Sequence, residues 1–244
     1  MIKERKSGQL IVISAPSGCG KGSVINGLLK RNKNLWLSVS TTSRQIREND
    51  IPGVTYNFVT EEEFKEKIKE GFFLEYTNYV GNYYGTPKGT IKEKLDQGID
   101  VILEIEIEGA ANIKKLIPEA IFIFILPPSL KTMVKRLQKR GTDSKEKIIK
   151  RFHTAYKEIN EVTKYNYVVV NDILEDAIDK VEAIITAEKC RVDRIEEVFV
   201  DTKEEEIHEL LMDDEKAFDN ESLSEKLDLS LIHISEPTRR SYIS

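Results

Sequence analysis

Residues 13–24, ISAPSGCGKGSV, bring together the groups needed to hold a polyphosphate. Gly18, Gly20 and Gly22 let backbone N–H groups turn toward an anion, and Lys21 adds a mobile positive charge. An apolar run precedes the loop and a stretch with helical character follows it, so a helix N-terminus adds favourable potential. This context favours an ATP phosphate site over the alternative, a glycine-rich turn with a solvated lysine. The ATP-binding residues predicted in the loop are Ala15, Pro16, Ser17, Gly18, Cys19, Gly20, Lys21, Gly22 and Ser23.

The loop departs from the usual pattern G-x-x-x-x-G-K-[ST] at two positions. Ala15 stands in place of the first glycine, and Gly22 stands in place of the hydroxyl residue. The hydroxyl has moved on by one place, to Ser23, as in the Gly-Lys-Gly-Thr loop of adenylate kinases, which this segment resembles. We therefore expect Mg²⁺, bound with ATP, to meet Ser23 through water or to be held mostly by the phosphates of the nucleotide.

Five short apolar segments along the chain have the character of buried strands, and helical segments lie between them. The predicted strands are residues 9–14, 36–40, 100–107, 121–126 and 167–170. The predicted helices are residues 23–30, 109–116, 130–139, 145–162 and 174–194. This alternation predicts an α/β fold in which helices cover both faces of a parallel sheet.

Residues 41–98 have a different composition, rich in Tyr, Gly, Asn and Thr. Two strand-like pieces, 55–59 and 72–76, lie on either side of a predicted helix at 61–70. Thr60 and Glu63 have the spacing of a capping box at the start of that helix. We interpret the interval as a small lobe inserted into the α/β core.

Several separated segments are similar to the guanylate kinase family, in that family's order and spacing, over about residues 8–195. They are SVSTTSRQIR (38–47), YNFV (56–59), FLE (73–75), GNYYGT (81–86), ILPPS (125–129), RL with RG (136–137 and 140–141) and VND (170–172). The resemblance implies a P-loop nucleoside monophosphate kinase with a five-stranded parallel sheet and flanking helices. It also implies a core at 1–40 and 99–195, a GMP-binding α+β lobe at 41–98 and a helical lid at about 130–151.

Glu75 suits guanine on chemical grounds. The Watson–Crick edge of guanine presents two adjacent donors beside the O6 acceptor, and one carboxylate can accept from both donors. Ser40 and Thr86 offer hydroxyl groups to the rest of the edge. Adenine lacks the donor pair, so a buried Glu75 would discriminate against AMP. Alone, Glu75 would be interpreted as an exposed strand carboxylate, but the neighbouring motifs favour guanine recognition.

The resemblance further implies which residues hold the GMP phosphate. Arg44 and Arg47 would clamp it, and Tyr56 and Tyr84 would add phenolic donors. A pair of loop arginines facing water is the structural alternative, and such pairs are common.

The resemblance implies four positions around ATP and the transferring phosphoryl group. Arg140 and Arg151 match lid arginines that close over that group, Arg136 lies in a matching motif, and Asn171 matches a residue near adenine. The alternative for the two lid arginines is a solvated basic helix face, and the alternative for Asn171 is a turn at a strand end.

Glu104 and Glu106 replace the pair of aspartates that is usual in the family. Alternation along a strand predicts that both side chains lie on one side of it. One would approach the metal and the other the guanine, without the sequence deciding which. They could instead pair with nearby lysines.

These residues together predict ATP-dependent phosphorylation of GMP, and of dGMP, to the diphosphate, with Mg²⁺ as cofactor. Catalysis would be in-line positioning and charge neutralisation by Lys21, Arg44, Arg47, Arg140 and Arg151. One alternative is a guanylate-kinase-like module that binds partner peptides without turnover. Another is a kinase for a different nucleoside monophosphate.

The composition indicates which broad classes of protein and which partners we expect. Apolar residues make up 40% of the 244 and charged residues 32%, which is typical of a soluble protein. The apolar run at 120–126 is too short to span a bilayer. Two scattered cysteines predict neither a zinc site nor a disulfide framework and favour a reducing cytoplasm. We expect ATP and GMP as partners, no nucleic acid or membrane partner, and a monomer or small homo-oligomer.

The C-terminal part of the chain is strongly acidic. Twelve acidic residues and three lysines between 201 and 228 give a net −9, and residues 229–244 carry +1. Because the whole chain carries −5, residues 1–200 carry +3, which suits phosphate-bearing ligands. We assign no function to the extension at 196–228. The segment LSLIHISEPTR can be encoded by DNA resembling a sequencing-library adapter, so we interpret 229–244 as an assembly artefact.

Overall fold

The computed structural model describes residues 2–4, 7–48, 50–79, 81–139 and 145–198. Residues 7–186 lie in one compact unit, and residues 2–4 and 187–198 lie in a second. The predicted lid turn at 140–144, the acidic segment from 199 onward and the segment 229–244 lie outside the described residues. No helix in the described part of the chain is long and apolar enough to cross a membrane.

A five-stranded parallel sheet forms the centre of the larger unit, in the order β10-β9-β2-β8-β3. The strands are β2 (Leu10–Ser14), β3 (Leu35–Leu37), β8 (Asp100–Glu104), β9 (Ile121–Leu126) and β10 (Tyr167–Val170). All five residues of β2 are buried, as its continuous apolar sequence predicts for a central strand. The phosphate loop follows Ser14 directly, so it emerges from the middle of the sheet at the carboxyl edge, where open α/β sheets bind ligands.

Helices cover the sheet on both faces because alternate strand residues point to opposite sides. In the described part of the chain, six helices lie around the sheet: α1 (Lys21–Arg31), α3 (Lys88–Asp96), α4 (Ile107–Leu116), α5 (Leu130–Lys139), α6 (Lys145–Ile159) and α7 (Leu174–Lys189). A 3₁₀ turn, Asn160–Lys164, continues from α6. Ile11 and Ile13 share a buried cluster with α1, α5, α6 and α7, whereas Leu10 and Val12 share one with α3 and α4.

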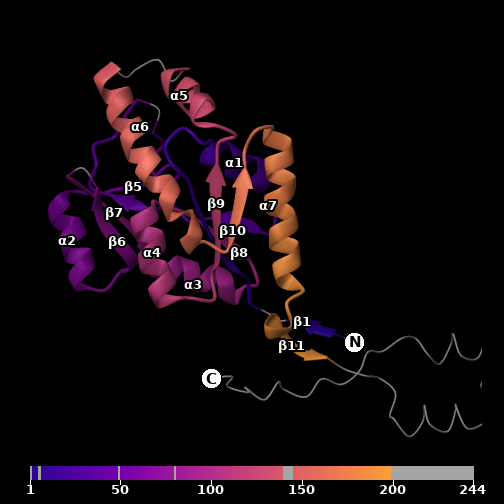
Figure 1. The fold of residues 1–244 in the computed structure, drawn as a ribbon. Helices are drawn as coiled ribbons and strands as arrows, with labels where there is room; N and C mark the ends of the chain where they lie inside the picture. Colours follow the sequence, from indigo (N-terminus) through magenta and orange to yellow (C-terminus); the bar gives the residue numbers. More distant parts are fainter. Residues whose placement is uncertain (1, 5–6, 49, 80, 140–144, 199–244) are drawn as a thin grey trace, which may run out of the picture. The chain divides into compact units, whose positions relative to one another are not determined.

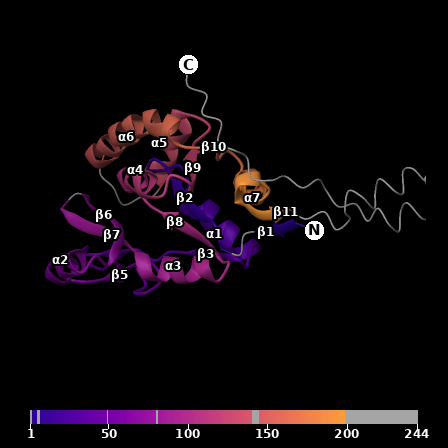
Figure 2. The same cartoon turned by 90° about the horizontal axis from the view of Figure 1, so that it is seen from below.

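The inserted lobe has its own four-stranded sheet, in the order β5-β4-β7-β6. Its elements are β4 (Thr41–Thr42), β5 (Asn57–Phe58), α2 (Glu61–Lys69), β6 (Phe73–Tyr79) and β7 (Asn82–Pro87). Phe64 of α2 stacks on Phe73 with ring centroids 4.4 Å apart, which gives the lobe an aromatic core. Figures 1 and 2 both show the lobe on one side of the central sheet and α7 on the opposite side.

The capping box predicted at Thr60 is present. The Thr60 hydroxyl accepts from the Glu63 backbone N–H at 3.2 Å, and the Glu63 carboxylate accepts from the Thr60 N–H at 2.7 Å. The strands at 121–126 and 167–170 and the helix at 130–139 also have the predicted bounds.

Several predicted bounds differ from the structure. The strand predicted at 36–40 is Leu35–Leu37, the strand piece predicted at 72–76 is Phe73–Tyr79, and the helix predicted at 145–162 ends at Ile159. The strand predicted at 100–107 ends at Glu104, because the chain turns at Ile105 and α4 begins at Ile107 instead of residue 109. The helix predicted to run to 194 ends at Lys189. The short β4, β7 and α3 were not predicted.

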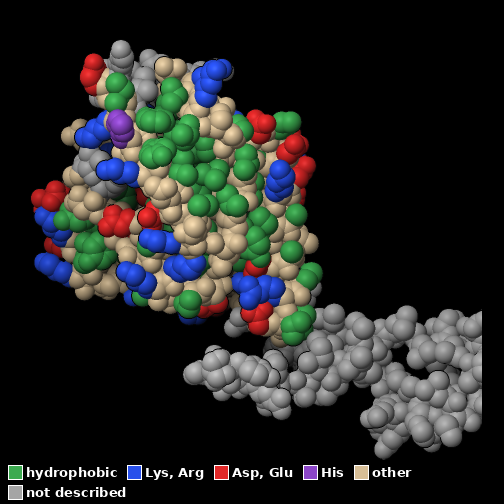
Figure 3. Space-filling view, in the orientation of Figure 1, with side chains coloured by type: hydrophobic (Ala, Val, Ile, Leu, Met, Phe, Trp, Pro, Cys, Tyr) green, Lys and Arg blue, Asp and Glu red, His purple; other side chains and the backbone are tan. Residues whose placement is uncertain are grey.

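One face of the edge strand β10 is exposed in the described part of the chain. Val168 and Val170 are 53% and 43% exposed, whereas Val169 between them is buried. Figure 3 shows hydrophobic side chains gathered over β9 and β10.

In the second unit, β1 (Ile2–Glu4) pairs antiparallel with β11 (Ile195–Val198). A 3₁₀ turn at Val192–Arg194 precedes β11, and Arg194 forms an ion pair with the buried Glu188 at 2.9 Å.

Candidate functional site

The loop between β2 and α1 has the backbone of an anion cradle. Gly18 and Gly20 have φ of 88° and 85°, a left-handed conformation that glycine adopts without strain. Gly20 is the N-cap of α1. The N–H groups of a first helical turn have no partner within the helix, so those of α1 are suited to meeting phosphate oxygens.

Lys21 lies between the loop and the turn that follows β8. Its Nζ donates to the backbone oxygen of Ile105 at 3.3 Å and lies 3.8 Å from Glu106 Oε1. The Ser14 hydroxyl donates to the same Ile105 oxygen at 3.0 Å. These contacts fix the turn after β8 beside the loop and place the ammonium group next to a carboxylate.

The prediction that Glu104 and Glu106 share one side of a strand is wrong. Glu104 is the last residue of β8, whereas Glu106 lies beyond the turn, where it is the N-cap residue of α4. A Cβ atom added at Gly22 would lie 3.8 Å from Glu104 Oε1, so this carboxylate faces the first turn of α1. The two glutamates thus approach the loop from different directions, Glu104 at Gly22 and Glu106 at Lys21.

In the lobe, Arg44 is buried and already oriented. Its guanidinium forms an ion pair with Asp50 at 2.9 Å and donates to the Gln45 backbone oxygen at 2.8 Å. It also lies 5.4 Å from the ring centroid of Tyr56 and 5.5 Å from that of Phe58. The Arg44 contact holds the pKa of Asp50 below its usual range, so the pair stays ionised at neutral pH.

Arg47 contributes differently. Its side chain is exposed, and its backbone N–H donates to Asp50 Oδ2 at 2.7 Å. Asp50 therefore organises the segment that carries both arginines. Sequence analysis missed Asp50, and its only signal there was a carboxylate close to two arginines in the chain.

Tyr56 lies in the lobe beside Tyr84. Its ring meets that of Tyr84 edge-on, with centroids 5.9 Å apart. Burial raises the pKa of Tyr56, and nearby Tyr84, Glu104 and Glu106 raise it further. The phenol therefore stays protonated at neutral pH and can donate. Arg44 lies over the Tyr56 ring, and Lys21 lies beside Glu106.

Glu75 on β6 has a buried carboxylate, and one of its two oxygens accepts a hydrogen bond. It is 7% exposed, and the Thr86 hydroxyl donates to its Oε1 at 2.6 Å. Among the described residues, none donates a hydrogen bond to its Oε2. Burial raises the pKa of Glu75, with a smaller contribution from the charge of Glu108. A buried acceptor without a donor is costly unless a ligand supplies one.

The lack of a side chain at Gly109 leaves room for the Glu75 carboxylate. Gly109 lies in the first turn of α4, and a Cβ atom added there would lie 3.0 Å from Glu75 Oε2. The carboxylate therefore packs against the helix backbone where no side chain intervenes. Sequence analysis did not single out Gly109, because the contact is between segments far apart in the chain.

Two residues predicted to bind ATP and one predicted lid arginine lie at the loop or beside it. Asn171 is buried, and its Nδ2 donates to the Cys19 backbone oxygen at 2.8 Å. Arg136 on α5 donates to the Asn171 backbone oxygen at 3.0 Å. Arg151 on α6 donates to the Ser17 hydroxyl at 2.8 Å. Both helices of the predicted lid therefore contact the loop or its support.

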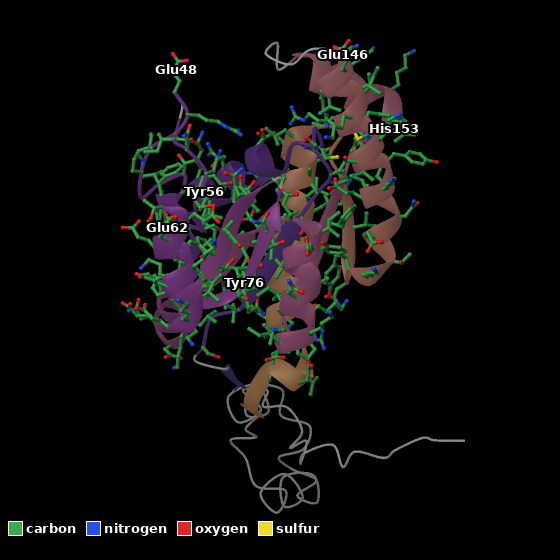
Figure 4. The ribbon with its side chains drawn as sticks, turned by 90° about the vertical axis from the view of Figure 1, so that its left-hand side faces the viewer. Glu48, Tyr56, Glu62, Tyr76, Glu146 and His153 are labelled. Carbon is green, nitrogen blue, oxygen red and sulfur yellow. The ribbon has the colours of Figure 1, made fainter. Side chains whose placement is uncertain are left out.

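Three further predicted residues are Ser40, Ser23 and Arg140. Ser40 is half-buried, and its backbone oxygen accepts from the Asn57 N–H at 2.8 Å. Ser23 is exposed at the start of α1. Arg140 lies outside the described residues. Figure 4 shows the labelled Tyr56 in the lobe and the labelled Glu146 and His153 on α6, separated across the view.

We compared the chain with known protein families, proteins and solved structures. The guanylate kinase family model matches residues 7–188. The chain belongs to the guanylate kinase family. It is 56% identical over 208 residues to a guanylate kinase of Clostridium tetani, covering 85% of this chain and 100% of the relative. It is 52% identical to one of Clostridium acetobutylicum, covering 85% and 99%.

A solved guanylate kinase structure is also similar to this chain. The crystal structure of guanylate kinase from Anaplasma phagocytophilum superposes with a TM-score of 0.67 at 30% identity, covering 88% of this chain and 98% of that one. The resemblance found in the sequence, the enzyme class and the P-loop kinase fold with its five-stranded parallel sheet are therefore confirmed. The comparisons support ATP-dependent GMP phosphorylation and favour neither a binding module nor a kinase for another monophosphate.

Proposed function

We propose that the protein transfers the γ-phosphoryl group of ATP to GMP and that Glu75 selects the guanine. The observation that carries this proposal is the buried Glu75 carboxylate, whose Oε2 lacks a donor among the described residues. Guanine supplies two adjacent donors, N1–H and the exocyclic amine, whereas adenine offers an acceptor at N1. Because Thr86 already donates to Oε1, it acts by orienting Glu75, and its oxygen stays available as an acceptor for guanine.

The GMP phosphate would bind between Arg44, Arg47 and the phenols of Tyr56 and Tyr84. The ordered guanidinium of Arg44 supports this assignment, since an oriented donor loses little entropy on binding. The exposed Arg47 can move onto the phosphate without breaking a buried contact. Ser40 would complete the guanine edge.

ATP would bind with its phosphates on residues 15–23 and its adenine beside Asn171 and Arg136. Lys21 would leave the Ile105 oxygen and Glu106 for the β- and γ-phosphates, a stronger attraction because the phosphates carry more charge. Arg151 would leave Ser17. Together with Arg140, it would then neutralise the charge of the transferring group. No covalent intermediate is needed, since positioning and charge neutralisation carry phosphoryl transfer.

The residues at the loop fit a magnesium ion. Mg²⁺ is usually held by one or two carboxylates together with substrate phosphates and water, and Glu104 faces the turn of α1 that carries Ser23. Glu104 and the Ser23 hydroxyl, the latter through water, would hold the ion. The bound ion would supply positive charge that offsets the negative charge of the phosphates.

A coupled assay over AMP, GMP, CMP and UMP with ATP tests this function. We expect turnover with GMP and a kcat/KM for AMP lower by about 10⁴-fold, because AMP leaves the Glu75 carboxylate without donors. Comparable kcat/KM values for AMP and GMP would refute guanine selection, and failure to turn over any of the four would refute the enzymatic role.

Replacing Gly109 by Ala tests the assignment of Glu75 from its packing. The new methyl group would meet Oε2 at 3.0 Å and displace the carboxylate. We expect KM for GMP to rise by about tenfold or more with KM for ATP unchanged, since small misplacements of binding groups are costly. Gly89→Ala is the matched control, because a Cβ atom there has no neighbour within 4 Å. An unchanged KM for GMP in Gly109→Ala would contradict the assignment.

The cellular setting belongs to the same proposal. The reaction would serve purine nucleotide metabolism in the cytoplasm, with ATP and GMP as partners and with dGMP as a second acceptor. A monomer or small homo-oligomer would suffice, since every residue assigned above comes from one chain.

A further inference from the structure

Asn171 follows β10 directly, and both of its backbone polar groups are hydrogen-bonded. Its N–H donates to the Leu126 backbone oxygen at 2.7 Å, and its own backbone oxygen accepts from Arg136 Nη1 at 3.0 Å. Arg136 Nη2 also donates to the backbone oxygen of Asp172 at 3.4 Å. The side chain of Asn171 therefore extends from a backbone that the central sheet and α5 hold in place.

The side-chain amide of Asn171 packs against the backbone of the phosphate loop. Asn171 is 4% exposed, and its Nδ2 donates to the Cys19 backbone oxygen at 2.8 Å. A Cβ atom added at Gly20 would lie 2.4 Å from the same nitrogen, so the amide occupies the space that a side chain at Gly20 would need. One donor of this amide is therefore used by the loop and not by the nucleotide.

This contact fixes the orientation of the peptide unit between Cys19 and Gly20. The unit is trans, and in a planar trans unit the C=O and N–H groups point in opposite directions. Because Asn171 holds the Cys19 oxygen on one side, the Gly20 N–H points to the other side. Gly20 is also the N-cap of α1, and backbone N–H groups at a helix N-terminus are suited to binding anions.

Without the Asn171 amide, this peptide unit would be easier to turn over. Glycine adopts positive and negative φ about equally well, so the chain at Gly20 lacks the steric restraint that a side chain gives. In the turned form, the Cys19 carbonyl oxygen would take the place of the Gly20 N–H, and an acceptor repels an anion. The amide of Asn171 disfavours that form, because its buried donor would lose its partner.

We propose that Asn171 is a positioning residue whose amide fixes the Cys19–Gly20 peptide unit, so that the Gly20 N–H faces the phosphates before ATP binds. This inference rests on the proposed function, because it takes the loop to be the ATP phosphate site. A donor that is oriented in advance loses little entropy on binding. The contribution of Asn171 should therefore extend to any polyphosphate, whether or not an adenine is attached to it.

Calorimetric binding of ATP and of inorganic tripolyphosphate to Asn171→Ala separates a role at the loop from a role at adenine. We expect both affinities to fall by the same factor, about fivefold or more, which is the usual effect of losing one buried hydrogen bond. In initial-rate kinetics, KM for ATP should rise while KM for GMP stays unchanged, because GMP binds in the lobe.

Asn160→Ala is the matched control, because Asn160 is an exposed amide in the 3₁₀ turn that continues from α6. We expect this variant to bind ATP and tripolyphosphate as the original protein does. A loss of affinity for ATP alone in Asn171→Ala would show that the amide binds adenine and would overturn the proposal. No loss for either ligand, or an equal loss in the control, would overturn it as well.

The NMR resonance of the Cys19 carbonyl carbon in the nucleotide-free protein gives a readout that does not depend on binding or turnover. A hydrogen bond to a carbonyl oxygen moves this resonance downfield, so we expect an upfield shift in Asn171→Ala but not in Asn160→Ala. Asn171→Val, which also lacks the donor but fills more of the buried space, should show the same shift. An unchanged resonance in either Asn171 variant would refute the positioning role. If the unmodified protein fails to phosphorylate GMP while tripolyphosphate binding and this resonance change as expected, the proposed function fails and the positioning role stands.

Discussion

Replacing Lys21 by Met is expected to lower kcat by about 10²–10³-fold, the usual cost of losing one group that stabilises transition-state charge. Met has similar length and fits the nearly buried stem of the side chain, which is 13% exposed. The change therefore removes the positive charge with little change in packing. Initial-rate kinetics with ATP and GMP at saturation measure it directly.

Lys30→Met is the control for that experiment. Lys30 lies on the same helix, is exposed, and carries the same charge away from the loop. We expect kcat within about twofold of the original, because screened surface charges have small effects. A similar loss in both variants would mean that the net charge of α1, and not the position of Lys21, carries the effect.

Replacing Glu75 by Gln is expected to lower kcat/KM for GMP by about 10²-fold, because one charge-assisted acceptor becomes an amide donor facing the guanine donors. KM for ATP should stay unchanged, since Glu75 lies in the lobe and not at the loop. Glu66→Gln, an exposed carboxylate on α2 of the same lobe, is the matched control. Equal kcat/KM for GMP in the original protein and in Glu75→Gln would remove Glu75 from guanine recognition.

The same variant should be more stable than the original at neutral pH. Burial raises the folded-state pKa of Glu75. Between the unfolded and folded pKa values the folded protein then binds more protons, so the contribution of this group to stability falls as pH rises through that range. Removing the ionisable group removes this cost, and we expect a higher Tm at pH 7 with little difference under acid conditions that protonate Glu75. A lower Tm of Glu75→Gln at pH 7 would contradict the conclusion that burial of the ionised Glu75 carboxylate destabilises the folded protein.

Much of the central sheet could be predicted from the sequence because its signals are local. The strand at 121–126 is a continuous apolar run that ends at Pro127-Pro128, and both of its bounds were correct. The capping box at Thr60 and Glu63 was likewise readable, since both partners lie within one turn.

Elements that depend on distant partners were missed. The segment NYYGTP contains glycine and proline and has weak strand propensity, yet it forms β7 by pairing with β6 and β4. Alternation in residues 100–107 continues through Glu104 and Glu106, so the sequence did not show the turn at Ile105, which Lys21 and Ser14 hold through its backbone oxygen.

The residues of the candidate site also divide into those with a local signal in the sequence and those that depend on distant contacts. The loop residues could be found because the spacing of their motif points to them, and Glu75 could be found because the motifs around it resemble those of the guanylate kinase family. Asp50 and Gly109 could not, since a lone carboxylate or glycine carries no signal until the fold brings it to Arg44 or Glu75.

The central claim is that GMP bound at Glu75 directs its phosphate toward ATP held over Lys21. The most direct test is calorimetric binding of adenosine and guanosine joined 5′ to 5′ by five phosphates, compared with GMP and ATP separately. Two half-sites at the correct separation should bind the linked molecule at least about 10²-fold more tightly than either nucleotide alone. Lys21→Met and Glu75→Gln should each weaken that binding. An affinity no higher than that of the better single nucleotide would contradict the account.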